Sequence, residues 1–82
     1  MNRRRSGSTR EFARRLRQRR ERMKWTRKVL ADKMDVCVAT IGNWERGKGF
    51  PRLGSREDLC ELLGTTAEQL HLPPYNDGDV DI

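Results

Sequence analysis

The stretch from Thr26 to Gly47, TRKVLADKMDVCVATIGNWERG, constrains the fold more than any other part of the sequence. Its apolar residues recur at helical spacing in two short runs, over residues 27–34 and 38–46. Residues 35–36 separate the two runs and fit a tight turn, and Gly47 follows the second run, where glycine commonly ends a helix. The stretch therefore predicts two short helices joined by a turn.

The segment before this stretch predicts a basic helix. Ser8 and Glu11 have the spacing of a capping box, which marks the beginning of a helix. Phe12, Leu16 and Met23 follow at helical spacing, so we expect these three side chains to face the core. The remaining positions of this helix are mostly arginine.

The segment after the stretch predicts two more helices. Ser55 and Asp58 form a second capping box, and the apolar face that follows it consists of Leu59, Leu62 and Leu63. A last short helix is expected to begin at Thr65 or Thr66, with Leu70 pointing inward. Because no segment alternates as a strand does, the sequence predicts an all-α fold of five helices.

The length of the chain, 82 residues, suits one domain. We expect a flexible basic arm over residues 1–7, a helical domain over residues 8–72 and an acidic tail over residues 73–82. No long apolar run is present, and no apolar stretch follows the basic N-terminus. Neither a membrane span nor a secretory signal is therefore expected.

The cysteine and histidine content indicates the compartment. Cys37 and Cys60 are too few for a disulfide framework, and neither they nor the single His71 have partners at metal-ligand spacing. We therefore expect a cytoplasmic protein, in a reducing compartment, with no metal and no cofactor.

Positive charge is concentrated in the first third of the chain. Residues 1–28 contain thirteen Lys or Arg against two acidic residues, whereas residues 29–82 contain five against ten, and the chain as a whole carries +6. A positive region of this kind attracts phosphate polyanions. Arg3, Arg4 and Arg5 could reach DNA phosphates or a narrow minor groove, or could belong to an ordinary disordered terminus.

The sequence gives no indication of an enzyme. It contains no Ser/His/Asp set, no glycine-rich phosphate loop and only one histidine. The carboxylates of Glu57, Asp58 and Glu61 share one predicted helix and fit a solvated face at the beginning of that helix. We therefore expect a chain that is not an enzyme.

The central residues resemble the phage repressor/Cro superfamily, the xenobiotic-response-element class of helix-turn-helix domains. The run TIGNWERGKGFP is similar to the family's frequent tIsrwErGkrnP, and the resemblance covers about residues 12 to 70. Further matching residues are Leu30, Ala31, Val36, Leu53, Leu59, Leu63, Gly64 and Leu70. The resemblance implies a five-helix repressor of transcription, which binds double-stranded DNA with its third helix in the major groove. It also implies a homodimer on a pseudo-palindromic site.

The resemblance assigns roles to individual residues. The positions that would read bases are Val38, Ala39, Thr40 and Asn43, and the positions that would contact phosphates are Arg27, Lys28, Arg46, Lys48 and Gly49. Ile41 and Trp44 are three residues apart, so helical spacing directs both inward, and they match core positions of the family. Glu45 should form a salt bridge with Arg20 of the first helix, and this pair would brace the third helix.

The chain departs from the family at the reading helix. Asp35 replaces the usual turn glycine, and Cys37 replaces the usual Ser or Thr cap. Val38 and Ala39 replace the polar residues that often read bases. Asn43 can still bond to adenine, and the small side chains can pack on thymine methyl groups, so we expect a preference for A·T pairs. Recognition of DNA shape is the alternative.

The acidic tail, residues 73–82, leaves a second function open. The chain could be an antitoxin-like or adaptor protein whose tail binds a protein partner. Alternatively, the tail could fold back on the basic arm and tune non-specific DNA binding.

Overall fold

The computed structural model describes residues 9–72 of the chain, and these residues form four helices and no strand. The helices are α1 (Thr9–Arg22), α2 (Arg27–Met34), α3 (Val38–Glu45) and α4 (Leu53–Leu63). The expectation of an all-α fold is confirmed for this part of the chain. The predicted arm, the predicted tail and the cap at Ser8 lie outside the described residues.

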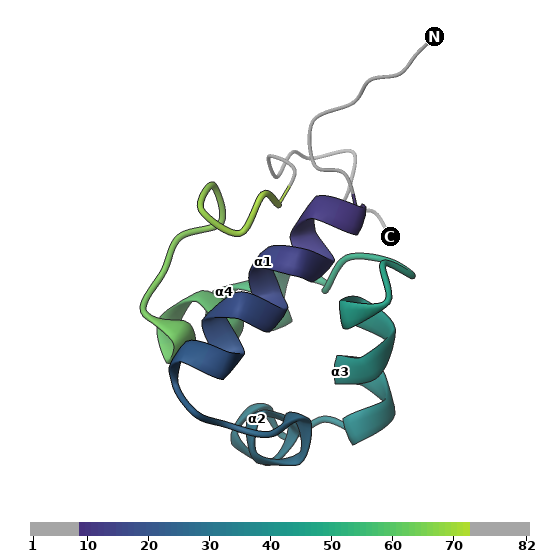
Figure 1. Ribbon diagram of the computed structural model, residues 1–82, viewed down its shortest axis with the longest axis vertical. Helices are drawn as coiled ribbons and strands as arrows, with labels where there is room; N and C mark the ends of the chain where they lie inside the picture. The colour runs from purple at the N-terminus through teal and green to yellow at the C-terminus, as the bar shows by residue number, and fades with distance from the viewer. Residues whose placement is uncertain (1–8, 73–82) are drawn as a thin grey trace, which may run out of the picture.

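The helices are arranged around α1, which runs diagonally through the view in Figure 1. α3 packs against both α1 and α2, and α2 also contacts α4. The chain that follows α4 passes on the other side of α1 from α3 (Figure 1). None of the helices within residues 9–72 is both long and apolar enough to cross a membrane.

One apolar core joins all four helices and the segment after α4. Its fully buried large side chains are Phe12, Leu16, Leu30, Ile41, Leu59 and Leu70. Burying each such side chain contributes about 1.5–3 kcal/mol to folding. Phe50, in the loop after α3, packs against Phe12 with a ring-centroid distance of 5.5 Å, so this loop is also fixed to the core.

The expectation that Met23 faces the core is wrong. Its side chain is 40% exposed, whereas Phe12 and Leu16 are buried as predicted. The reason is that α1 ends at Arg22, and Met23 already lies in the turn that leaves the helix. Helical spacing therefore no longer determines where the Met23 side chain lies.

Each helix ends in the same way, with a residue in the left-handed backbone region. In α1 the residue is Lys24, with φ of 64°; its N–H donates to the Glu21 carbonyl, and the Trp25 N–H donates to the Arg20 carbonyl. This pair of bonds defines a Schellman motif, which satisfies carbonyls at the end of a helix. The equivalent residues of α2, α3 and α4 are Asp35, Gly47 and Gly64.

We expect Lys24→Gly to stabilise the protein. A side chain in the left-handed region costs about 1–2 kcal/mol, and part of this cost is offset by the greater freedom of glycine in the unfolded chain. The free energy of unfolding, measured by urea denaturation, should therefore rise by about 0.5–1 kcal/mol. Lys28→Gly removes the same charge inside α2 and should instead destabilise by about 1 kcal/mol. A loss of stability in both variants would contradict the strain assigned to Lys24.

The predicted beginning of α4 at Ser55 is wrong. The helix begins at Leu53, and its N-cap is Arg52, which has an extended backbone and makes no side-chain capping bond. The Arg56 N–H donates to the Arg52 carbonyl at 2.8 Å, which closes the first turn. Ser55 therefore lies inside this turn, and the Ser55–Asp58 spacing does not mark the cap.

The predicted fifth helix is also wrong, because residues 67–71 form consecutive turns. The Leu70 N–H donates to the Thr66 carbonyl, but His71 adopts a left-handed φ of 64°, which ends the turns at once. So short a segment offers few hydrogen bonds to offset the cost of helix nucleation. Leu70 is nevertheless fully buried, as predicted.

Candidate nucleic-acid interface

α2 and α3 form the helix-turn-helix unit that the sequence predicted. The Thr26 hydroxyl oxygen accepts a hydrogen bond from the Val29 N–H at 3.1 Å, so Thr26 caps α2. Asp35 ends α2 with φ of 59°, in the left-handed conformation that the family's usual glycine adopts easily at this position. Cys37 precedes α3 and makes no side-chain capping bond, as expected of a poor cap.

α3 has one buried and one exposed face. Ile41 is fully buried and Trp44 is 8% exposed, so both occupy the core positions that the resemblance implied. On the other face, Val38 is 49% exposed, and Ala39 and Asn43 are also exposed. Thr40, the fourth residue expected to read bases, is half-buried at the border between the two faces.

A buried ion pair fixes the end of α3 to α1. The Glu45 carboxylate has no exposed surface and accepts two hydrogen bonds from Arg20, from Nε to Oε2 at 2.6 Å and from Nη2 to Oε1 at 3.0 Å. Nη1 of Arg20 donates to the Trp25 carbonyl at 2.8 Å. The hydrogen bond with Glu45 raises the pKa of Arg20 above its ordinary value, so the guanidinium stays charged although it is buried. The pair expected between Arg20 and Glu45 is present.

Arg27 is the second cation on Glu45. Its Nε donates to Oε1 of Glu45 at 3.0 Å, and its side chain remains 41% exposed. The resemblance assigned Arg27 to a phosphate and did not indicate this bond. A guanidinium has five N–H donors. The bond with Glu45 occupies one of them, so Arg27 can hold the carboxylate and still donate to an anion.

Asn43 and Arg46 also contact each other. Nη1 of Arg46 donates to Oδ1 of Asn43 at 3.3 Å, on the exposed side of α3. The Arg46 guanidinium lies beside Gly42, because a Cβ built on Gly42 would be 3.6 Å from Nη1. A bidentate bond from Asn43 to adenine would use the same carbonyl oxygen, which has two lone pairs and can accept from a base and from Arg46 together.

Three arginines of α1 lie next to the end of α3, and the sequence had not singled them out. Arg10, Arg14 and Arg17 line a groove together with Arg46. Arg14 forms an ion pair with Glu11, and Arg17 forms one with Glu21 at 3.1 Å. Their spacing of four and three residues places them on one side of a helix, and this was the available signal. The groove extends the positive surface from α3 to the beginning of α1.

The remaining phosphate candidates lie at the two ends of the helix-turn-helix unit. Lys28 in the first turn of α2 and Lys48 after α3 are exposed, and Gly49 is half-buried. Arg3, Arg4 and Arg5 lie outside the described residues. Within residues 9–72, no group of three His, Cys, Asp or Glu side chains is placed to hold a metal ion.

Residues 11–72 match a helix-turn-helix domain family, and the chain belongs to this family. The class of protein is therefore a helix-turn-helix DNA-binding domain, and the resemblance to the repressor/Cro superfamily is confirmed. A search of curated proteins found no match to the sequence.

Solved structures share this fold. Hydroxypropylphosphonic acid epoxidase from S. wedmorenis is 30% identical, with a TM-score of 0.74, over 89% of this chain and 39% of that chain. A hypothetical transcription factor, NHTF from Neisseria, is 27% identical, with a TM-score of 0.71, over 82% of this chain and 77% of that one. The restriction-modification controller protein C.AhdI from Aeromonas hydrophila is 24% identical, with a TM-score of 0.69, over 76% and 94% of the two chains, and shows the fold alone.

These structures correct the expectation that the chain is not an enzyme. The first solved structures that match are those of the epoxidase, which is an enzyme, and this chain spans about 40% of their length. The expectation rested on the absence of catalytic sets within these 82 residues. That ground is insufficient, because the same fold occurs as one part of a longer enzyme chain.

Proposed function

We propose that the chain is a sequence-specific regulator of transcription that binds double-stranded DNA with α3 in the major groove and acts as a repressor. The observation that carries the proposal is the two-faced geometry of α3. One face is fixed by Ile41, Trp44 and the buried Glu45, and the other presents Val38, Ala39 and Asn43 to solvent. Rigid placement of such a face allows a helix to read base edges.

The charges around α3 support contacts with the DNA backbone. Arg27 and Lys28 lie at the beginning of α2, and Arg46 and Lys48 lie just beyond the end of α3. Arg27 also donates to Glu45, the last residue of α3, so Arg27 and Arg46 both lie at the end of α3, where the phosphates of a bound duplex would meet positive charge. Phosphate contacts provide affinity and fix the register of the protein, but they carry no sequence information.

Base selection would then rest on few side chains. Asn43 can bond to adenine, and Val38, Ala39 and Thr40 can pack on thymine methyl groups. We therefore propose a half-site rich in A·T pairs, bound by a homodimer on a pseudo-palindromic site. Transcription factor NHTF, by its name, supports a role in regulation for this fold. Such a protein would repress by covering its site.

Selection of bound duplexes from a random DNA pool, at two salt concentrations, tests the proposal. We expect enrichment of a two-fold symmetric site with A·T pairs in each half. Replacing the thymines of that site with deoxyuridine removes only their methyl groups, so it measures the contribution of Val38, Ala39 and Thr40 directly. Enrichment of no sequence would contradict the proposed function, and enrichment without A·T pairs would contradict the proposed readout.

Lys48→Ala should weaken binding equally to all DNA sequences. Each lost phosphate contact lowers the slope of log affinity against log salt by about 1 per half-site. The ratio of the affinities for the selected duplex and for a scrambled duplex should stay unchanged. Arg22→Ala, at the far end of α1, removes the same charge and serves as the control. An equal change of slope in both variants would show that only net charge matters.

A further inference from the structure

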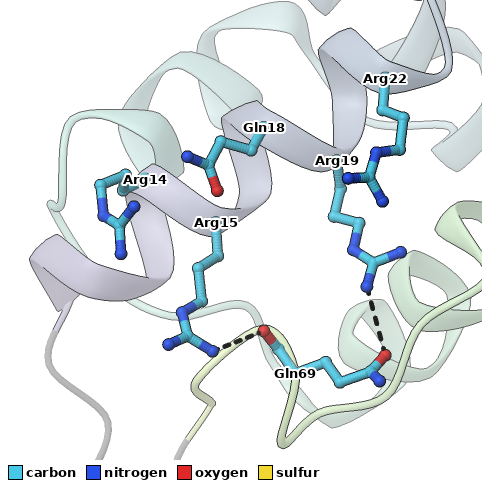
Figure 2. A pocket seen from close by; sticks show the side chains of 6 residues that line it. All are labelled: Arg14, Arg15, Gln18, Arg19, Arg22 and Gln69. Carbon is cyan, nitrogen blue, oxygen red and sulfur yellow. Dashed lines mark hydrogen bonds between the residues drawn. The ribbon is translucent and has the colours of Figure 1, made fainter.

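A second basic surface lies along α1 and shares Arg14 with the groove beside α3. Arg14, Arg15, Arg19 and Arg22 line an open pocket of about 250 Å³ together with Gln18 and Gln69, and we call this set the arginine pocket. Figure 2 shows the side chains of Arg15 and Arg19 reaching from α1 to Gln69. Arg15 donates to the Gln69 backbone carbonyl at 3.1 Å, and Arg19 donates to its side-chain oxygen at 3.4 Å.

Apart from Arg14, the arginine pocket lies on the side of α1 that faces away from α3. At about 100° per residue, Arg15 and Arg22 lie on roughly the opposite side of α1 from Ala13 and Arg20. Ala13 lines the groove beside α3, and Arg20 holds Glu45 of α3. A duplex placed on the exposed face of α3, as the proposed function requires, would therefore not reach Arg15 or Arg22.

The positive charge of the arginine pocket is only partly neutralised. Arg14 and Arg15 form ion pairs with Glu11. Among the described residues, no acidic side chain forms an ion pair with Arg19 or Arg22. Arg19, which donates to Gln69, and Arg22 thus line the same pocket without a neutralising acid among the described residues, and this arrangement fits a ligand that carries several carboxylates or phosphates.

We propose that the acidic tail of this chain, the segment DGDVD at residues 77–81, binds the arginine pocket. Gln69 lines the pocket, and the described chain ends three residues later, at Leu72. The five residue steps from Leu72 to Asp77 can span up to about 17 Å. Arg15 and Arg22 are only about 10 Å apart along α1. The tail therefore starts next to the pocket and is long enough to cover it.

The spacing of the acids suits the pocket as well. Asp77, Asp79 and Asp81 alternate with other residues, and in an extended segment every second side chain lies on the same side. Three carboxylates could then meet Arg19, Arg22 and their neighbours together. Because the segment is tethered, its effective concentration at the pocket is about millimolar, which favours it over a free anion or a second copy of the chain. The bound tail would keep non-specific DNA off this side of the protein.

Nuclear magnetic resonance of the arginine Nε–Hε groups tests this proposal in the full chain without DNA. The tail variant carries Asp77→Asn, Asp79→Asn and Asp81→Asn, and should shift the Arg19 and Arg22 signals in about 20 mM salt. The control replaces three exposed acids of α4, through Glu57→Gln, Asp58→Asn and Glu61→Gln, with the same change in net charge. It should leave the Arg19 and Arg22 signals unshifted. In about 0.5 M salt, the wild type should resemble the tail variant.

Other outcomes would overturn the proposal. Equal signals in the wild type and the tail variant would show an empty pocket, and shifts that grow with protein concentration would assign the pocket to the tail of a second copy. If the Arg22 signal shifts only when duplex DNA is added, and shifts equally in the wild type and the tail variant, the arginine pocket binds phosphate instead. The reciprocal variant, Arg19→Gln with Arg22→Gln, should shift the amide signals of residues 77–81. Since these measurements need no specific DNA site, their failure would leave the proposed function intact.

Discussion

Arg20→Ala should lower the free energy of unfolding by about 3 kcal/mol, the largest loss of stability that we expect from removing one charged side chain of this chain. The reason is that the Glu45 carboxylate is fully buried and would lose both of its hydrogen bonds from Arg20. The bond from Arg27 would remain, so the loss should fall at the low end of the range for a broken buried pair. Urea denaturation followed by tryptophan fluorescence measures it.

Arg17→Ala is the matched control for this variant. Arg17 lies on the same helix and forms an ion pair with Glu21, but both side chains are more than half exposed. Exposed pairs contribute at most about 1 kcal/mol, so this variant should remain close to the wild type. Similar losses in the two variants would contradict the special role of the buried pair.

The same substitution separates stability from DNA binding. Because Arg20 fixes the end of α3 through Glu45, Arg20→Ala should weaken DNA binding at temperatures at which the variant is still folded. Arg20→Met combined with Glu45→Met removes the whole buried pair and should recover part of the lost stability, since no charge is then left without its partner. Full DNA affinity in the folded Arg20→Ala variant would show that the pair stabilises the fold without positioning α3.

Asn43→Ala should remove most of the preference for A·T at one position of each half-site. A bidentate bond between an amide and adenine is worth about 1–3 kcal/mol of discrimination, which corresponds to roughly 5-fold to 150-fold in affinity. Affinity for scrambled DNA should change little, because Asn43 carries no charge and the loss of its bond with Arg46 leaves that arginine able to contact a phosphate. Titration of the selected duplex and of single-base variants measures the effect.

Lys48→Ala provides the contrast to this variant. It should weaken binding to the selected and the scrambled duplex alike, whereas Asn43→Ala should weaken binding to the selected duplex only. If Asn43→Ala left the pattern of base preference unchanged, recognition would have to rest on DNA shape or on the small side chains at the beginning of α3.

The sequence predicted the helix-turn-helix unit well because its signals are local. Helical spacing placed Ile41 and Trp44 in the core, and Thr26, Asp35 and Gly47 had the chemistry that helix ends require. Each of these signals depends on a residue and its neighbours within one turn. Such local preferences predict the structure correctly when they are consistent with the packing of the core.

The errors arose where the deciding interaction was not local. Lys24 and His71 end their segments in the left-handed region, which residues other than glycine adopt uncommonly. α4 begins at Leu53 despite a capping box two residues later, and residues 67–71 follow a helical pattern without forming a helix. In these places, the apolar spacing and the capping pattern were not enough to fix where a helix begins or ends.

In the candidate site, too, the contacts between residues far apart in the sequence were the ones that local patterns could not predict. The bond between Arg20 and Glu45 joins residues 25 positions apart, and only the family resemblance indicated it. The third member of this network, Arg27, and the α1 arginines of the groove beside α3 became apparent only when the helices were placed in space. Long-range electrostatic contacts leave no periodic pattern in a sequence, so spacing alone could not have found them.

The most direct test of the central proposal compares two duplexes of equal length and composition, the selected site and its scrambled version, at about 0.15 M salt. If α3 reads bases in the major groove, the selected duplex should bind about 10³-fold more tightly or better. Asn43→Ala should reduce that ratio, whereas Lys48→Ala should not. A wild-type ratio close to one would contradict the account, because it would leave only the sequence-independent attraction of the arginines.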